Sequence, residues 1–409
     1  MGERTEPEIR ILDSEAELRE ASALFRTAMV GLPSWPEVPD GTVGRYLEAG
    51  RTWGAFLDGM LVGTVDATSG KLTLPGGARV PHAAVTHIGV LPTHTRRGVI
   101  SGLVHRQLSD ARDRGEILAT LRASEATIYG RFGYGVASTS VSVDVDVRRA
   151  ALRPDVPEFG SVRLLTYPDA WDVLAQIHSR HLPPRPGMID RSEYWWNSRR
   201  WRADSLTDPM YVAVHGEPGQ EDGFVRYHPV DTQGWFTSRN RTVVVDDFFA
   251  PSPGAYAGLI RFLLDLDLVD TLRFAALPQD DQLPLMLGDA RAVHFRSVSD
   301  ETWLRILDLD RALSARSYRG FGSVTVEVTD PVLTDNAGVF EISADGAART
   351  AGAADLTIDI ADLGALLLGR QGWHRMVDAG RVRVHRAEAV DTADLLFSWP
   401  QAPFSGTSF

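Results

Sequence analysis

The chain has 409 residues, a length that predicts two or three domains, and its 44% hydrophobic and 23% charged residues are typical of a soluble globular protein. No apolar run approaches the roughly 18 residues of a membrane helix and Met1 opens no secretory signal, so we expect a cytoplasmic protein without a membrane partner. The net charge of -12 argues against a nucleic acid partner and suits a cationic substrate. The absence of cysteine excludes disulfides, thiolate metal sites and a cysteine nucleophile.

The first 80 residues predict a strand, a helix and a hairpin. Residues 8–12 suit a strand, and the capping-box pattern that begins at Ser14 predicts the helix that follows. The apolar runs 53–57 and 60–65 flank Asp58 and Gly59, a pair that favours a tight hairpin turn.

The segment from Val85 to Gly135 combines an apolar strand with a basic turn that opens a helix. The strand ends at Val90, and Arg96, Arg97 and Gly98 precede a helical pattern of apolar residues from Ile100 to Ala111. Backbone N–H groups and the positive end of the helix dipole converge at such a turn, which suits a pyrophosphate. A short buried strand at 117–123, a tyrosine segment at 124–135 and an alternating strand at 141–147 follow.

Strand, phosphate turn, helix, strand and tyrosine segment come in an order that resembles the GCN5-related (GNAT) N-acetyltransferases. Residues 90–98 and 129–135, the chain length and the final Phe409 resemble more closely the Eis (enhanced intracellular survival) family. The resemblance implies a mixed α+β fold with two GNAT-type domains, the second degenerate, and a C-terminal sterol-carrier-protein-like domain. We expect their limits at 1–150, 151–297 and 298–409.

The same resemblance implies acetyl-CoA as co-substrate and no metal. The residues expected to bind the coenzyme are Ile88, Gly89, Val90, Arg96, Arg97, Gly98, Val99, Ile100, Ser101, Ser124 and Glu125. Thr95 stands where the family usually has the first of three arginines, so the backbone cradle is the expected contact there. His82, His87 and His94 lack an accompanying carboxylate pattern and are interpreted as strand and loop residues.

Two groups are the candidate catalysts. Tyr129 stays protonated at neutral pH and can act as a general acid; from the residues alone, a packed aromatic with a satisfied hydroxyl is an equal alternative, and the resemblance implies the acid. The resemblance implies that the terminal carboxylate, carried on Phe409, is the general base; the alternative is a frayed chain end. Tyr134 and Phe132 are interpreted as core residues.

The remaining two thirds of the chain predict a repeat of the first order of strands and helices, followed by a region with a different pattern. Strands and helices from 162 to 275 repeat the first order of elements, but residues 250–254, at the place of the arginine turn, include no basic residue. We expect this copy to bind no coenzyme and to wall the substrate pocket. Beyond 298 we expect a helix carrying Trp303 to Leu313, then strands and helices that either bind a lipid or form an ordinary core that delivers the chain end.

The resemblance also bears on partners. It implies primary amines of aminoglycosides and lysine side chains as acceptors, with Trp35 and His87 as tentative pocket residues, and a homohexamer built as a trimer of dimers. The competing hypothesis is a non-catalytic acyl-CoA- or lipid-binding protein on the same scaffold.

Overall fold

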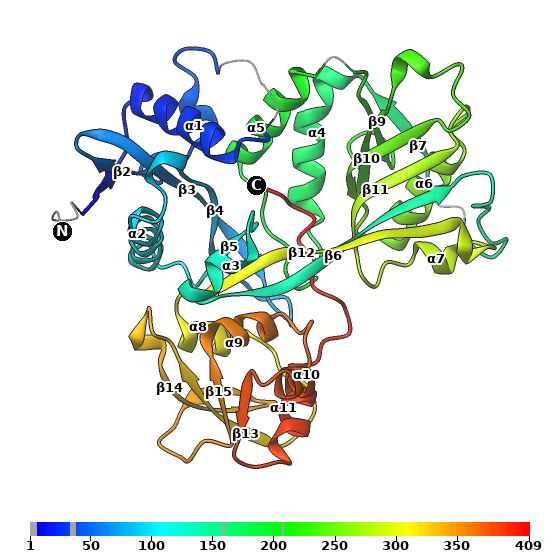
Figure 1. The fold of residues 1–409 in the computed structure, drawn as a ribbon. Coiled ribbons are helices and arrows are strands. Elements are labelled where there is room, and N and C mark those ends of the chain that lie inside the picture. The colour runs from blue at the N-terminus through cyan, green and yellow to red at the C-terminus, as the bar shows by residue number, and fades with distance from the viewer. Residues whose placement is uncertain (1–5, 33–37, 158–159, 207) are drawn as a thin grey trace. The chain divides into compact units, whose positions relative to one another are not determined.

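The computed structural model describes residues 6–32, 38–157, 160–206 and 208–409, and it divides into two compact units (Figure 1). The first unit comprises Met1–Ser138, Pro184–Ser198 and Glu301–Phe409, and the second comprises Thr139–Pro183 and Arg199–Asp300. The chain changes unit inside two long strands, β6 (Tyr134–Asp146) and β12 (Val293–Ile306), and inside the helix α5 (Glu193–Asp204). The expected domain limits at 1–150, 151–297 and 298–409 stay a prediction.

The first unit holds a mixed sheet whose strands lie in the order β1-β2-β3-β4-β5-β12-β6, with β4 and β5 parallel. Its strands and helices are β1 (Glu8–Ile11), α1 (Glu15–Met29), β2 (Trp53–Leu57), β3 (Met60–Thr73), β4 (Arg79–Val90), α2 (Val99–Asp113), β5 (Leu118–Leu121) and α3 (Ala126–Tyr129). Residues 187–190 extend this arrangement, because the Thr73 N–H donates to the Met188 carbonyl, the Gly187 N–H donates to the Thr73 carbonyl, and Leu72 forms a β-bridge with Ile189. A distant stretch of sequence thus becomes part of the first unit.

Local sequence signals explain the ends of these elements. Ser14 caps α1, and its capping box with Glu17 is complete. Asp58 and Gly59 both adopt positive φ and close the expected hairpin between β2 and β3. Helix α2 ends where Gly115 turns left-handed, with the N–H of Glu116 bonded to the carbonyl of Ala111 as in a Schellman cap.

The second unit repeats this order of elements, as the sequence predicts. Its strands lie in the order β6-β11-β10-β9-β8-β7, with β10 and β11 parallel. The elements are β7 (Val162–Leu165), α4 (Tyr167–Arg180), β8 (Tyr211–His215), β9 (Gly223–Pro229), β10 (Thr242–Phe249), α6 (Pro253–Leu264), β11 (Thr271–Pro278) and α7 (Leu283–Met286).

The C-terminal part of the first unit contains a five-stranded sheet in the order β15-β14-β13-β16-β17. The elements are α8 (Leu309–Ala315), β13 (Ser323–Thr329), β14 (Gly338–Ser343), β15 (Gly346–Arg349), β16 (Leu356–Asp359), α9 (Ile360–Leu367), α10 (Trp373–Asp378), β17 (Val382–Val384) and α11 (Ala389–Phe397). The strands and helices expected in this part of the chain are confirmed.

The helix expected around Trp303 is wrong, because residues 293–306 form β12 and the helix begins only at Leu309. Trp303 to Ile306 pair with β5, so these residues belong to the first sheet. All four residues from Trp303 to Ile306 are buried. A strand buried on both faces lacks alternation, and periodicity cannot distinguish it from a buried helix.

One hydrophobic core joins the two sheets of the first unit. Leu304 and Ile306 of β12 lie in the same cluster as Val326 of β13 and Leu363 of α9. Arg305, between them, forms a fully buried ion pair with Asp330, at 2.7 and 2.9 Å from the two carboxylate oxygens. Buried charges are tolerated when they are paired in this way, so β12 is fixed to both sheets.

Candidate active site

The outer half of β4 has one open edge. Its parallel pairing with β5 covers His82 to Ala84, whereas its antiparallel pairing with β3 continues to Val90. In the described part of β4, the backbone N–H and C=O groups that follow Ala84 and face β5 therefore form no hydrogen bonds in the pairing with β5. The expected coenzyme residues Ile88, Gly89 and Val90 lie on this stretch, where backbone N–H groups are available to an extended ligand arm.

A β-bulge shapes this edge at His87. Thr64 of β3 faces Gly89 and Asp66 faces Thr86, so β4 carries one extra residue in the interval. His87 takes a positive φ of 50°, and its Nδ1 lies 3.4 Å from a carboxylate oxygen of the buried Asp66. The ring also packs edge-on against Phe25. His87 is thus held in a strained, partly exposed position beside the open edge, while its role in acceptor binding stays a prediction.

The arginine turn leads directly into α2. Arg96, Arg97 and Gly98 are exposed; Arg96 and Gly98 have positive φ values of 60° and 86°, and no side chain caps the helix. The first N–H groups of a helix have no partner within it, so those of Val99 to Ser101 are directed outward with two cationic side chains beside them. These residues fit a phosphate-bearing cofactor.

The tyrosine segment follows β5 and includes α3. Tyr129 is 3% exposed and packs edge-on against Tyr134, within a cluster that also contains Phe132. Burial raises the pKa of Tyr129 above its usual value near 10; a hydrogen bond with Ser124 opposes this shift and the charge of Glu125 adds to it. The phenol is therefore protonated at neutral pH. Exposed Ser124 and Glu125 lie at the entrance to α3.

Tyr134 differs from Tyr129 in its surroundings. Its hydroxyl is buried without a hydrogen-bond partner among the described residues, and burial raises its pKa. It lines a cavity of about 770 Å³ with Gly130, Trp303, Asp362 and Arg381. Tyr134 is thus a core residue, as expected, and it provides a matched comparison for Tyr129.

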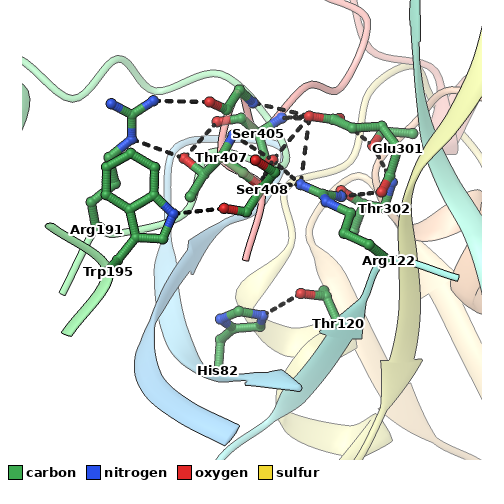
Figure 2. Close-up of polar contacts among 12 residues, drawn as sticks. His82, Thr120, Arg122, Arg191, Trp195, Glu301, Thr302, Ser405, Thr407 and Ser408 are labelled. Atoms are coloured by element: carbon green, nitrogen blue, oxygen red, sulfur yellow. Dashed lines mark hydrogen bonds and ion pairs between the residues drawn. The ribbon is translucent and has the colours of Figure 1, made fainter. Parts of the chain in front are cut away.

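The C-terminal tail is held along its last residues. Ser405 and Thr407 are 0% and 2% exposed. The Trp195 indole donates to the Ser408 carbonyl at 2.7 Å, and Arg191 donates to Gly406 and Thr407 (Figure 2). The Phe409 ring is half-buried and lies 5.2 Å from the Arg122 guanidinium. The tail therefore does not fray, and its red trace ends beside α5 in Figure 1.

Both candidate catalysts are connected with the segment that follows β5. Tyr129 sits in the segment after β5, and Phe409 packs on Arg122, the residue that directly follows β5. No hydrogen bond or ring contact joins the two in the described structure, which is consistent with an acid and a base that act on different atoms. Trp35 lies outside the described residues.

The sequence analysis did not predict the residues that hold the C-terminal tail. They come from three separate stretches of the chain: Arg122, Arg191 with Trp195, and Glu301. No local motif connects these stretches with residues 405–409. The position of Arg122 directly after a buried strand is the only signal that could have indicated one of them.

Two general features limit the chemistry. Within residues 6–32, 38–157, 160–206 and 208–409, no three His, Cys, Asp or Glu side chains are grouped so that they could hold a metal ion. None of the helices that the structure describes is long and apolar enough to cross a membrane.

Three family models match the chain. Models described as acetyltransferase (GNAT) domains match residues 8–137 and 187–306, and a sterol carrier protein domain model matches residues 309–406. A GCN5-related N-acetyltransferase from Anabaena variabilis has the same fold, with a TM-score of 0.82 over 98% of this chain at 18% identity. Fold and site thus define an N-acetyltransferase of the GNAT class that carries a sterol-carrier-protein-like domain.

More similar relatives identify the family. The N-acetyltransferase Eis of Mycobacterium tuberculosis is 31% identical over 345 residues, 80% of this chain and 81% of that protein. The crystal structure of Eis1 from Mycobacterium abscessus is 44% identical, with a TM-score of 0.91 over 98% of this chain and 100% of that one. An uncharacterized N-acetyltransferase of Streptomyces griseus is 36% identical over 95% of both chains. The chain belongs to the Eis family of N-acetyltransferases, which confirms the resemblance, the fold class and the expected acyltransferase.

Proposed function

We propose that this enzyme transfers an acetyl group from acetyl-CoA directly to primary amines of cationic acceptors, namely aminoglycosides and lysine side chains. Tyr129 is the proposed general acid and the carboxylate of Phe409 the general base. The observation that supports this most is the burial of Ser405 and Thr407, because only an anchored chain end can keep a carboxylate at a fixed place.

Acetyl-CoA, when bound, supplies an acetyl thioester to the site. The N–H groups of Ile88 to Val90, on the open edge of β4, would hold its extended arm. Arg96, Arg97 and the first N–H groups of α2 would hold its phosphates, because positive charge and unpaired donors coincide there. The cradle needs no side chain from Thr95, whose hydroxyl already donates to the Pro92 carbonyl at 3.3 Å.

A base is needed because the acceptor is protonated. A lysine-like amine has a pKa of about 10.4, so only on the order of one molecule in a thousand is nucleophilic at neutral pH. In this proposal the Phe409 carboxylate removes the proton from the acceptor nitrogen. The net charge of -12 favours the approach of a cation.

An acid is needed at the leaving sulfur. Tyr129 carries its proton at the phenol oxygen, and the raised pKa keeps that proton in place over the whole neutral range. The proton passes from the phenol to the departing sulfur as the bond to the acetyl carbon breaks. Before the next turnover the phenolate recovers a proton from solvent, and the Phe409 carboxylic acid releases to solvent the proton that it took from the acceptor nitrogen.

Release of the free thiol from acetyl-CoA in the presence of kanamycin tests the acid. Tyr129→Phe should lower kcat roughly 100-fold, the usual contribution of a general acid. Tyr134→Phe is the matched control, because it removes an unpartnered hydroxyl from the same cluster and should change kcat less than twofold. Equal kcat values for the two variants would remove Tyr129 from the mechanism. If no amine is turned over and the protein binds a lipid tightly, the non-catalytic alternative is favoured.

An extended chain tests the base. Residues appended after Phe409 convert its carboxylate into a neutral amide, so we expect turnover to be abolished while the dissociation constant for coenzyme A changes little. Full activity of the extended chain would exclude the terminal carboxylate.

We also propose a homohexamer, built as a trimer of dimers, as the active assembly. This proposal rests on membership of the Eis family. Light scattering after size exclusion should give about six times the chain mass, and a monomer at micromolar concentration would contradict it.

A further inference from the structure

Glu301 receives the C-terminal tail through a set of donors. Its carboxylate accepts from the backbone N–H groups of Ser405 and Gly406 at 3.1 and 3.0 Å and from the Ser405 hydroxyl at 2.9 Å. Ser138 of β6 donates a further bond at 2.7 Å. The Glu301 side chain is 9% exposed. A carboxylate can only accept hydrogen bonds, so this arrangement of donors matches its chemistry.

Arg122 is the cationic side chain that holds the same tail beside the Glu301 carboxylate. Its guanidinium donates to the Ser405 hydroxyl and the Thr407 carbonyl of the tail, and to the Thr302 hydroxyl at 2.5 Å (Figure 2). It lies 3.6 Å from a carboxylate oxygen of Glu301. The planar guanidinium offers five donors in a fixed fork, so one side chain holds four acceptors on two segments: the three oxygens named above and the backbone carbonyl of Glu301.

Arg122 also connects the tail with the tyrosine segment. It directly follows β5 and lies seven residues before Tyr129 in the chain, while its guanidinium is 5.2 Å from the Phe409 ring. One short, anchored segment therefore contacts the last residue and carries the candidate acid.

We propose that Arg122 and Glu301 are positioning residues that lock residues 405–407 and thereby set the place of the Phe409 carboxylate. The inference rests on the proposed role of that carboxylate as base. Neither side chain is assigned a proton transfer; each acts through the tail. Their loss should release the tail and lower kcat, with the coenzyme site left intact.

The test compares Arg122→Gln and Glu301→Gln with the native enzyme and with a chain that lacks Phe409. Glu301→Gln puts an amide donor among the N–H groups and hydroxyls that now donate to the carboxylate. The control is Arg386→Gln, which breaks a partly exposed ion pair with Asp355 in the same unit. Three quantities are measured: the rate at which carboxypeptidase A releases Phe409, kcat with kanamycin, and the dissociation constant for coenzyme A.

We expect Arg122→Gln and Glu301→Gln each to release Phe409 at least tenfold faster than the native enzyme and to lower kcat at least tenfold. Their affinity for coenzyme A should stay within about threefold of the native value. The control should match the native enzyme in all three. Unchanged release of Phe409 in the folded variants overturns the proposal. Faster release of Phe409 with native kcat also overturns the proposal, and the chain without Phe409 then shows which part failed. If that chain is inactive, the terminal base stands and only the positioning by Arg122 and Glu301 is wrong. If that chain is active, the base itself is wrong.

Discussion

The two acetyltransferase-like halves of this chain keep the same strand arrangement but begin their central helices differently. Parallel pairing of β4 with β5 stops at Ala84, and that of β10 with β11 stops at Val245, although both first strands continue further. In both halves, the two parallel strands therefore stop pairing before the first of them ends. At α2 the helix start is uncapped and follows two exposed arginines.

The start of α6 is already satisfied by the protein itself. Ser252 caps it by accepting from the N–H of Ala255 at 3.0 Å, and the same hydroxyl donates to Asp222 at 2.9 Å. Pro253 at the first helical position has no N–H to offer. A carboxylate beside a capped helix start repels a phosphate. The comparison teaches that an anion site depends on a few residues at one helix end, while the surrounding fold can stay the same.

Among the tests of this contrast between the two halves, the largest effect is expected at the arginine turn. Arg96→Ala combined with Arg97→Ala should weaken coenzyme A binding roughly 30-fold, because each exposed arginine contributes about 1 kcal/mol to a phosphate. The control removes two exposed arginines elsewhere, Arg319→Ala with Arg375→Ala. Isothermal titration should also give one site per native chain; two sites would break the contrast between the halves.

A second prediction concerns a histidine in the first half. Burial, and then the charges of Arg122 and Arg51, lower the pKa of His82 from 6.5 to about 3, so the folded protein keeps it neutral. The unfolded chain gains a proton below pH 6.5, and stability is therefore lost as the pH falls from 6.5 towards 3. At pH 5 the loss is about 2 kcal/mol. His82→Gln should flatten this dependence in urea unfolding at pH 7.5 and 5; an unchanged slope would contradict it.

Ser252→Ala tests the second half. Loss of the helix cap should lower the free energy of unfolding by about 1 kcal/mol. Coenzyme A affinity should not change, since α6 provides no phosphate site. Urea unfolding and calorimetric titration of the same sample distinguish the two quantities, and a weaker coenzyme complex would show that the second copy takes part in binding.

The smallest effect belongs to His228 on β9. A hydrogen bond that the His228 ring donates to Asp246 raises the pKa of His228, so this pair adds stability below pH 6.5 and loses it as the pH rises through the raised pKa. His228→Gln should cost a few tenths of a kcal/mol at pH 5.5 and nothing at pH 9, the scale of a surface pair. The slope has the opposite sign to that of His82, and equal signs would contradict both assignments.

Most elements could be predicted because local signals mark their ends. Ser14 with Glu17, Asp58 with Gly59, and Gly115 each determine a boundary within a few residues. The failure at β12 has a physical cause, because a central strand buried on both faces shows neither alternation nor helical periodicity. The strand is recognisable only once its partner β5 is known.

The candidate site divides in the same way. The coenzyme residues follow one another along the chain, so a motif can predict them together. The anchoring of the tail depends on Arg122, Arg191 and Glu301, which meet Ser405 and Thr407 only after folding. The sequence could therefore indicate the base as a member of a family, but not the residues that hold it.

The buried pair of Arg305 and Asp330 has a consequence for any shortened form of the protein. A shortened version that stopped before Leu309 would leave Arg305 without its counter-ion, at a cost of about 3–5 kcal/mol, and would uncover Leu304 and Ile306. Most globular proteins have only 5–15 kcal/mol to lose. The C-terminal domain therefore contributes to the stability of the acetyltransferase part whether or not it ever carries a lipid.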